Sequence, residues 1–278
     1  MKNIYSERII EKVAEKIVEI NYQLPEEVEN KIVEAYHKEK EKYSKKYLKI
    51  ILENIKIAKK NKIPICQDTG LPIVFVEIGT NVRIEFGKYK NLDEIINKGI
   101  EEGSKKGYLR SSIVTPIDRV NTKTNTPAVI HYFLTEGDKF KITIISKGFG
   151  SENTSRIKML NPSDGRKGIE EFIIETIKMA GGLPCPPIFV GVGIGGSFEK
   201  SAILSKYALT KIGQKTDYNK WENKIIKRIN DLRIGPGGFG GNITVLDLKI
   251  ETFPTHIAGL PVSVNICCWA HRIGSFEI

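Results

Sequence analysis

IFVGVGIGGSFEKSAILSKYAL, residues 188–209, contains the clearest change from strand to helix in this chain of 278 residues. The apolar run 188–193 predicts a buried strand, and residues 198–209 predict a helix that begins after a glycine-rich turn. A strand followed directly by a helix is typical of folds in which helices pack on a sheet. Together with the elements on either side, this unit indicates an α+β (mixed α/β) fold.

The region before this unit begins with helices and continues with strands. In the N-terminal portion, about 1–62, apolar residues recur at helical spacing after Ser6, which we expect to cap the first helix. Residues 136–138 predict the turn of a hairpin between two strands. The elements expected here are strands over 73–78, 128–134 and 140–146 and helices over 92–106 and 168–180.

The region after it contains a helix near 221–232, a glycine run at 235–241 and strands near 243–250 and 261–267. We expect the glycine run to be flexible and the strand that reaches Cys267 to be the last of the chain. No repeat or polar linker separates these elements, and 40% hydrophobic residues suffice for a substantial core. We therefore expect one domain over 1–278, with a helical N-terminal portion followed by mixed strands and helices.

The composition excludes some classes of function. The net charge is +10, but lysines alternate with glutamates and no nucleic-acid module is recognisable, so we expect no nucleic-acid partner. No apolar run reaches the roughly 18 residues that cross a bilayer, and the N-terminus lacks the apolar region of a signal peptide. We expect a soluble cytoplasmic protein with no membrane partner.

The chain has four cysteines, at positions 66, 185, 267 and 268. None forms the C-x-x-C pair of a zinc ribbon or ferredoxin, and structural disulfides are rare in the cytoplasm. The thiols are therefore either inert core residues or ligands that only folding brings together. Spacing alone favours inert core residues.

The neighbours of the cysteines point to chemistry. Cys66 opens the loop sequence CQDTG, which either forms an Asx-type turn or presents a thiolate beside Gln67 and Asp68. Cys185 lies between prolines, which make a loop rigid and suit a metal ligand. Cys267 and Cys268 point to opposite sides of an extended segment, so at most one serves a shared site. His256 alone is equally consistent with a core or a site residue.

Gly191, Gly193 and Gly196 fit the G-x-G-x-x-G pattern of dinucleotide-binding folds. Such folds need an acidic residue about twenty positions later, at the end of a second strand. The region 212–217 has no strand before it, which disfavours a dinucleotide site. Bare N–H groups at the start of the following helix still favour an anion.

Taken in order, seven segments resemble the N-terminal part of class I fumarases and the α subunits of two-subunit fumarate and tartrate dehydratases. They are CQDTG (66–70), KGFGSEN (147–153), CPP (185–187), GVGIGGSFEKSA (191–202), GPGGFGG (235–241), PTHIAGLPVSVN (254–265) and CWAHR (268–272). The resemblance implies a [4Fe-4S] cluster with one iron not ligated by protein. Its ligands would be Cys66, Cys185 and Cys268, and Cys267 would be an extra thiol.

The activity that the resemblance implies is a hydro-lyase reaction, the reversible hydration of fumarate to (S)-malate in the tricarboxylic acid cycle. By motif match, Gln67, Asp68, Arg110 and Gly150 would surround the substrate. Asp68 is the candidate for proton transfer, and His256 is a second catalytic candidate through its hydrogen bonds. An arginine suits a carboxylate because its guanidinium donates two parallel hydrogen bonds.

The single-chain relatives carry a further C-terminal domain that this sequence lacks. We therefore expect a separate β subunit, activity only in its presence, and an α2β2 hetero-oligomer. Two other functions stay open: the α subunit of an L(+)-tartrate dehydratase, and an Fe–S scaffold or electron-carrier protein.

Overall fold

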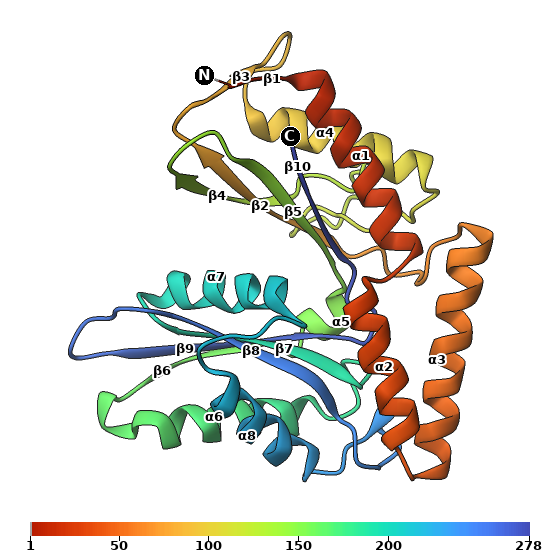
Figure 1. Ribbon diagram of the computed structural model, residues 1–278, viewed down its shortest axis with the longest axis vertical. Coiled ribbons are helices and arrows are strands. Elements are labelled where there is room, and N and C mark those ends of the chain that lie inside the picture. The colour runs from red at the N-terminus through yellow and green to blue at the C-terminus, as the bar shows by residue number, and fades with distance from the viewer. Residues whose placement is uncertain (1) are drawn as a thin grey trace. The chain divides into compact units, whose positions relative to one another are not determined.

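A computed structural model describes residues 2–278 (Figure 1), and the chain divides into two compact units. Unit 1 contains the residues up to Pro25, Asn54–Gly148 and Arg272–Ile278, and unit 2 contains Glu26–Glu53 and Phe149–His271. The predicted mixed α/β class is confirmed, with 42% helix and 25% strand. Both units are built from interleaved chain segments, and the single domain over 1–278 stays a prediction.

Unit 1 is a sheet covered on one face by two helices (Figure 1). Helix α4 confirms the helix predicted over 92–106. The four-stranded sheet has the order β10-β5-β2-β4, and a separate parallel pair joins β1 to β3. The bounds are β1 Lys2–Tyr5, α1 Ser6–Tyr22, β2 Leu71–Gly79, β3 Val82–Glu85, α4 Leu92–Lys106, β4 Val129–Thr135, β5 Phe140–Lys147 and β10 Ile273–Glu277.

Helices α1 and α4 pack closely because two residues of α4 have no side chain. A Cβ on Gly99 would lie 2.7 Å from Cβ of Val13, and a Cβ on Gly103 would lie 2.7 Å from the carbonyl oxygen of Ala14. Neither approach is possible for a larger residue without moving a helix. Ser6, expected to cap α1, instead donates its hydroxyl to Glu7, and α1 has no side-chain cap.

The predicted hairpin between residues 128–134 and 140–146 is wrong. Strand β2 lies between β4 and β5, parallel to the first and antiparallel to the second. The physical reason is burial: residues 72–76 of β2 are all buried, so β2 gains most from a central position, whereas exposure alternates along β4, as suits an edge. The sequence around the turn at 136–138 does not reveal that another strand, β2, will lie between β4 and β5.

The expectation that the strand reaching Cys267 is the last of the chain is also wrong. Residues 273–277 form β10, which is antiparallel to β5. Gly274 lets this strand lie against α1, because a Cβ there would be 2.7 Å from Ile20. A five-residue strand containing glycine and serine has little intrinsic strand signal, so tertiary contacts decide it.

Unit 2 has three layers, with α7 on one face of a four-stranded sheet and α6 and α8 on the other (Figure 1). The strand order is β6-β9-β7-β8, with β7 parallel to β8 and antiparallel to β9. Helix α3 begins in unit 2 and ends in unit 1. The bounds are α2 Glu26–Lys38, α3 Lys42–Asn61, α5 Phe149–Glu152, β6 Arg156–Leu160, α6 Gly165–Ala180, β7 Ile188–Gly195, α7 Phe198–Ala208, α8 Asn219–Asn230, β8 Val245–Phe253 and β9 Leu260–Cys267.

The glycines of the strand-to-helix segment serve packing. A Cβ on Gly191 would overlap the carbonyl oxygen of Ser205, and a Cβ on Gly193 would overlap that of Ser201. Helix α7 therefore lies directly on the backbone of β7. Two of the three glycines of the G-x-G-x-x-G pattern are accounted for in this way, which agrees with the sequence argument against a dinucleotide site.

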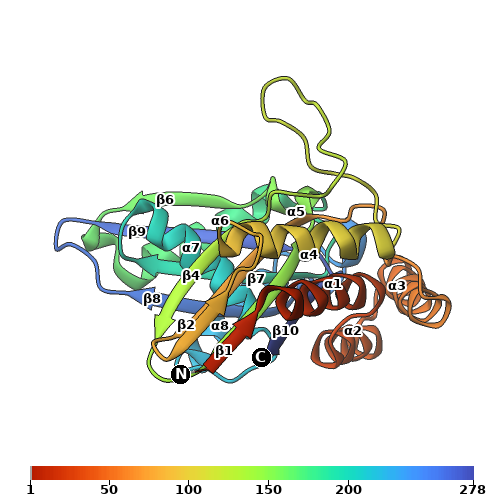
Figure 2. The ribbon, with the colours of Figure 1, turned by 90° about the horizontal axis from the view of Figure 1, so that it is seen from above.

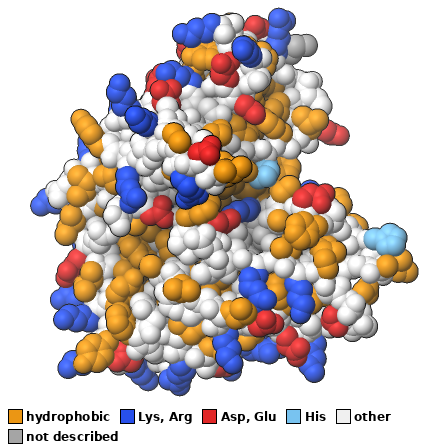
Figure 3. All heavy atoms as spheres, turned by 180° about the vertical axis from the view of Figure 1, so that it is seen from behind, with side chains coloured by type: hydrophobic (Ala, Val, Ile, Leu, Met, Phe, Trp, Pro, Cys, Tyr) orange, Lys and Arg blue, Asp and Glu red, His pale blue; other side chains and the backbone are white. Residues whose placement is uncertain are grey.

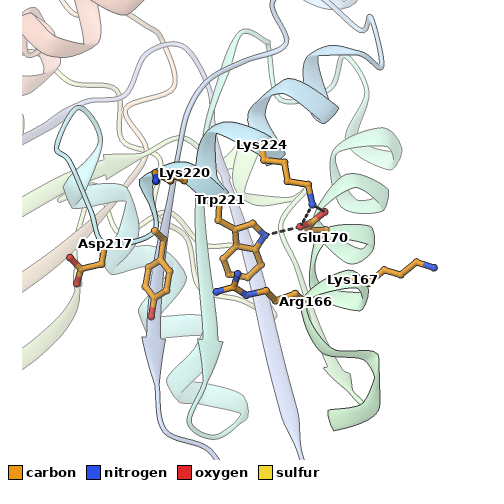
Figure 4. Close-up of a pocket in the computed structure, with 8 residues that line it drawn as sticks. Arg166, Lys167, Glu170, Asp217, Lys220, Trp221 and Lys224 are labelled. Carbon is orange, nitrogen blue, oxygen red and sulfur yellow. Dashed lines mark hydrogen bonds and ion pairs between the residues drawn. The ribbon is translucent and has the colours of Figure 1, made fainter.

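On the opposite face, Glu170 joins α6 to α8 beneath a surface groove (Figure 4). Its carboxylate accepts hydrogen bonds from Trp221 Nε1 at 2.8 Å, Lys224 Nζ at 2.9 Å and Arg228 Nη1 at 2.5 Å. Arg166 lies over the Trp221 ring, 4.9 Å from its centroid. Burial acts to raise the pKa of Glu170, but these hydrogen bonds outweigh it and the net pKa is lowered. The charged residues beneath the groove therefore have a structural role, which is to join α6 to α8.

Replacement of Glu170 tests this cluster. Because the folded-state pKa is lowered, the ionised carboxylate stabilises the fold above its ordinary pKa, and the contribution is lost as the pH falls through the lowered value. We expect Glu170→Gln to reduce the free energy of unfolding by about 1 kcal/mol at neutral pH, since two of the three donors are partly exposed. Urea unfolding as a function of pH measures the difference, which should vanish in acid.

Glu171→Gln is the matched control. Its carboxylate is paired only with Lys167, at 3.9 Å, and both side chains are more than half exposed. We expect a change within about 0.5 kcal/mol. Equal effects of the two substitutions, or a difference that persists in acid, would contradict the assignment.

Candidate functional site

The CQDTG loop of unit 1 precedes β2. Cys66 and Asp68 are half-buried and Gln67 is exposed. Asp68 Oδ1 accepts the N–H of Gly70 at 2.9 Å, so the Asx-type turn considered from the sequence is present. The turn fixes the backbone that carries Cys66, Gln67 and Asp68, and it is compatible with a role of these side chains in binding.

The same loop is bonded to the segment that carries Arg110. Thr69 Oγ1 donates to the carbonyl oxygen of Arg110 at 2.7 Å and lies 3.0 Å from Ser112 Oγ. The segment 107–128 extends away from the sheet of its own unit (Figure 2) and contains a single bridge between Val114 and Asn121. Within unit 1 the structure thus brings Arg110, whose side chain is exposed, to the loop that carries Gln67 and Asp68.

Arg272 is a buried support of the CQDTG loop. It is 1% exposed, and its Nη1 donates to the carbonyl oxygen of Asp68 at 2.5 Å and to Asn21 Oδ1 at 3.1 Å. A Cβ on Gly70, at a φ of +75°, would be 2.8 Å from the carbonyl group of Lys147. In the sequence Arg272 is only the last residue of the CWAHR motif, and no role is predicted for it. A buried arginine needs partners, but its partners are remote in the sequence.

In unit 2, Cys185 is exposed on the loop between α6 and β7. Its φ is +54°, a left-handed conformation that is uncommon for a residue other than glycine. Its N–H donates to the carbonyl oxygen of Gly182 at 3.2 Å. The two prolines that follow limit the backbone further, as the sequence indicated.

The adjacent cysteines lie in different environments. Cys267 is 1% exposed and ends β9, opposite Phe189 of β7. Cys268 is half-buried and follows the strand. This separation agrees with the alternation expected for an extended segment. Three residues on, His271 is fully buried against Phe189, with its Nε2 2.9 Å from the carbonyl oxygen of Leu209, so it serves the core.

Gly150 lies in the short helix α5, and it is exposed. A Cβ on this glycine would meet nothing within 4 Å. The helix is tied to its unit by Glu152, which forms an ion pair with Lys206 of α7 and accepts a hydrogen bond from Asn265 Nδ2 of β9 at 3.1 Å. The position that a side chain at residue 150 would occupy is therefore open, and the bonds of Glu152 fix the backbone of the helix.

His256 is exposed on the connection between β8 and β9. Its Nδ1 accepts the N–H of Ala258 at 3.2 Å, which restrains the ring. Thr255 Oγ1 donates to the carbonyl oxygen of Gly196 at 2.8 Å. The exposed position answers the question left open by the sequence: His256 is not a core histidine.

The expected site residues divide between the units. Unit 1 carries Cys66, Gln67, Asp68 and Arg110, and unit 2 carries Gly150, Cys185, His256 and Cys268. Within either unit, residues 2–278 contain no group of three or more His, Cys, Asp or Glu side chains placed to hold a metal ion. Of the four cysteines, Cys66, Cys185 and Cys268 are at least partly accessible and Cys267 is buried. Thiolates are the protein ligands typical of iron–sulfur clusters.

On the face shown in Figure 3, lysine and arginine side chains are mixed with aspartate and glutamate rather than gathered into one basic patch. No helix among residues 2–278 combines the length and the apolar character needed to cross a membrane.

Comparisons with known proteins agree with the motifs. A family model described as fumarate hydratase (Fumerase) matches residues 10–277. A Methanocaldococcus jannaschii protein named "Putative L(+)-tartrate dehydratase subunit alpha" is 43% identical over 274 residues, covering 95% of each chain. The L(+)-tartrate dehydratase subunit alpha of Escherichia coli strain K12 is 32% identical over 279 residues, covering 98% of this chain and 91% of the relative. The chain therefore belongs to the fumarate hydratase family.

Proposed function

We propose that the chain is the α-type subunit of an iron–sulfur hydro-lyase, with L(+)-tartrate as its first candidate substrate. The observation that carries the proposal is the similarity, over 95% or more of this chain, to proteins named L(+)-tartrate dehydratase subunit alpha. The accessible thiols and the arrangement around Asp68 and Arg110 are consistent with this chemistry. Hydration of fumarate, the main expectation from the sequence, becomes the second candidate.

Fumarate stays a candidate because the description of the matching family names that activity. Malate, the hydrated form of fumarate, differs from tartrate by one hydroxyl group. An enzyme that hydrogen-bonds the second hydroxyl of tartrate would reject malate strongly, because its polar groups would be left unpaired. A role in the tricarboxylic acid cycle follows only from the fumarate activity.

The cofactor in this proposal is a [4Fe-4S] cluster held by the thiolates of Cys66, Cys185 and Cys268. When bound, such a cluster, with one iron lacking a protein ligand, would supply a Lewis acid for the hydroxyl and carboxylate oxygens of the substrate. Cys267 stays in the core and is not a ligand. The proposal includes a cytoplasmic location, because a reducing compartment keeps cysteine thiols available as ligands.

The residues of the chain bind and orient the dicarboxylate. Arg110 donates two parallel hydrogen bonds to one carboxylate, and Gln67 donates its amide N–H. Asp68 takes the proton from the carbon adjacent to the one that loses its hydroxyl, and returns it in the reverse hydration. In this assignment the backbone N–H of Gly150 and the Nε2 of His256 contribute further hydrogen bonds. Thr69 and Arg272 do no chemistry themselves, but hold the backbone of Arg110 and Asp68 in place.

The partner in this proposal is a β subunit that completes the site, in an α2β2 assembly. The support is that the relatives are named subunit alpha. The alternative of an Fe–S scaffold or electron carrier predicts a cluster whose spectrum does not respond to a dicarboxylate.

Substitution of each cysteine tests the cofactor. We expect the chain, purified without oxygen and mildly oxidised, to give the EPR signal of a [3Fe-4S] cluster. Cys66→Ser, Cys185→Ser and Cys268→Ser should each remove that signal, since a cluster with two thiolates is not retained. Cys267→Ser is the matched control and should keep it, because Cys267 is buried in the core. Zinc or no metal in the wild-type chain would overturn the proposal.

Substitution of Arg110 tests substrate binding. With the β subunit present, we expect Arg110→Lys to lower kcat/KM by about tenfold or more, because a lysine cannot form the two parallel hydrogen bonds. Arg119→Lys, an exposed arginine on the same extended segment, should stay within about twofold. The assays should measure both dehydration of L(+)-tartrate and hydration of fumarate. The diacid with the higher kcat/KM is the better substrate, and activity on neither would contradict the proposal.

Substitution of Gly150 separates a substrate contact from a structural role. Because a Cβ there meets nothing in the chain, Gly150→Ala should leave the thermal unfolding midpoint unchanged or slightly raised. If the substrate approaches the Gly150 N–H, the added methyl group should raise KM by about tenfold. An unchanged KM would remove Gly150 from the substrate site.

A further inference from the structure

The Cys185 loop is a tight backbone turn. The N–H of Leu183 donates to the carbonyl oxygen of Ala180 at 3.1 Å, that of Cys185 donates to Gly182 at 3.2 Å, and Gly181 has a φ of +52°. Cys185 itself has a φ of +54°. A residue other than glycine keeps such a conformation only where its surroundings hold it. Contacts from a neighbouring segment of unit 2 therefore hold the Cys185 loop in this conformation.

The glycine run 235–241 contacts the Cys185 loop on both sides of the cysteine. After the cysteine, the carbonyl oxygen of Pro186 accepts the N–H of Gly237 at 2.7 Å. Before it, the backbone of Gly182 faces that of Gly238: a Cβ on Gly238 would be 3.0 Å from Cα of Gly182. A Cβ at this distance would require Gly182 to move by a few tenths of an ångström, and the φ of +77° at Gly238 also favours glycine.

The glycine run is in turn held from its far side, by the joint between α2 and α3. Glu39 is 1% exposed, and its carboxylate accepts the N–H groups of Asn242 at 2.8 Å and Ile243 at 3.1 Å, besides those of Lys40 and Glu41. Backbone that Glu39 holds thus follows the run directly, and the flexibility of the run stays a prediction. A buried carboxylate needs such donors, and they fix the chain that supplies them.

Ser44 adds a second attachment. It is fully buried, and its hydroxyl lies 2.5 Å from the carbonyl oxygen of Gly240 and 3.3 Å from that of Pro236. Both ends of the run are thus bonded, while its middle lies against the Cys185 loop. All of these residues belong to unit 2.

We propose that the glycine run 235–241 positions Cys185 as a cluster ligand, with Glu39 as the residue that anchors the run. This inference rests on the proposed function, since it gives Cys185 a metal to bind. It assigns a role to residues that touch neither substrate nor cluster. In this proposal the backbone contact between Gly238 and Gly182 sets the orientation of the Cys185 side chain. The carboxylate of Glu39 fixes the backbone that follows the run, and so keeps Gly238 against Gly182.

The test compares Gly238 with Gly240, because an added Cβ would contact the Cys185 loop at the first position and not at the second. Gly238 and Gly240 have φ values of +77° and +85°, so alanine strains the backbone similarly at both. A Cβ on Gly238 meets Gly182 of the Cys185 loop, whereas the nearest atom to a Cβ on Gly240 is the carbonyl oxygen of Arg233, at 4.0 Å. Gly240→Ala therefore controls for strain without pushing on the cysteine loop.

The first readout needs no cluster. In the metal-free chain, the alkylation rate of each cysteine by iodoacetamide is measured by mass spectrometry, because thiol reactivity depends on access and surroundings. We expect Gly238→Ala to change the rate at Cys185 by about fivefold and to leave Cys66 unchanged, and Gly240→Ala to leave both within about twofold. In the loaded chain, the [3Fe-4S] EPR line shape should change in Gly238→Ala and not in Gly240→Ala.

A second variant keeps the test valid if Gly238→Ala does not fold. Glu39→Gln preserves shape but has one accepting oxygen instead of two, so it should change the Cys185 rate in the same direction and to a smaller extent. Equal effects at Gly238 and Gly240, or no effect of Glu39→Gln, would overturn the positioning role. Failure of the proposed function is a separate result: Cys185→Ser would then retain the three-iron signal.

Discussion

The contact between α7 and β7 is the constraint on which unit 2 depends. Helix and strand touch backbone to backbone, because Gly191 and Gly193 have no Cβ that would strike the carbonyl oxygens of α7. A larger residue at either position would lift the helix from the sheet, and the ion pair from Lys206 of α7 to Glu152 would be lost with it. The short helix that carries Gly150 is therefore placed by two glycines about forty residues further along the chain.

The elements that sequence predicts well are those whose signal is local. The helix over 92–106 follows from its apolar spacing, and the different burial of Cys267 and Cys268 follows from strand alternation. The pairing of β2 with both β4 and β5, and the strand β10, depend on which segments compete for the centre of a sheet, and no local pattern records that competition. Strand pairing between distant segments is set by tertiary packing.

The same distinction applies to the site. Motifs select Cys66, Asp68 and Cys185 because these residue types carry chemistry, but they do not show that Arg272 and Glu39 support the loops. The role of a buried charge is defined by its partners, and those of Arg272 lie about 200 and 250 residues away in the sequence. For Arg272 the sequence signal is a charge beside apolar and small residues, and it does not name the partner. Glu39 lies in the charged run 37–42, where nothing in the sequence sets it apart from its exposed neighbours.

The buried acidic residues of unit 2 explain why the thiols are its metal-ligand candidates. Glu222 and Asp247 are bonded to Lys249 and to backbone N–H groups, Glu39 accepts four backbone N–H groups, and Glu170 accepts three side chains. Removing such a carboxylate from its donors to bind a metal would leave those donors unsatisfied, at about 1–3 kcal/mol each. Cys185 is exposed on a loop supported through its backbone, so its side chain can bind a metal without dismantling the fold. The buried carboxylates of unit 2 thus hold the structure, whereas the exposed thiol of Cys185 is available to a ligand without that cost.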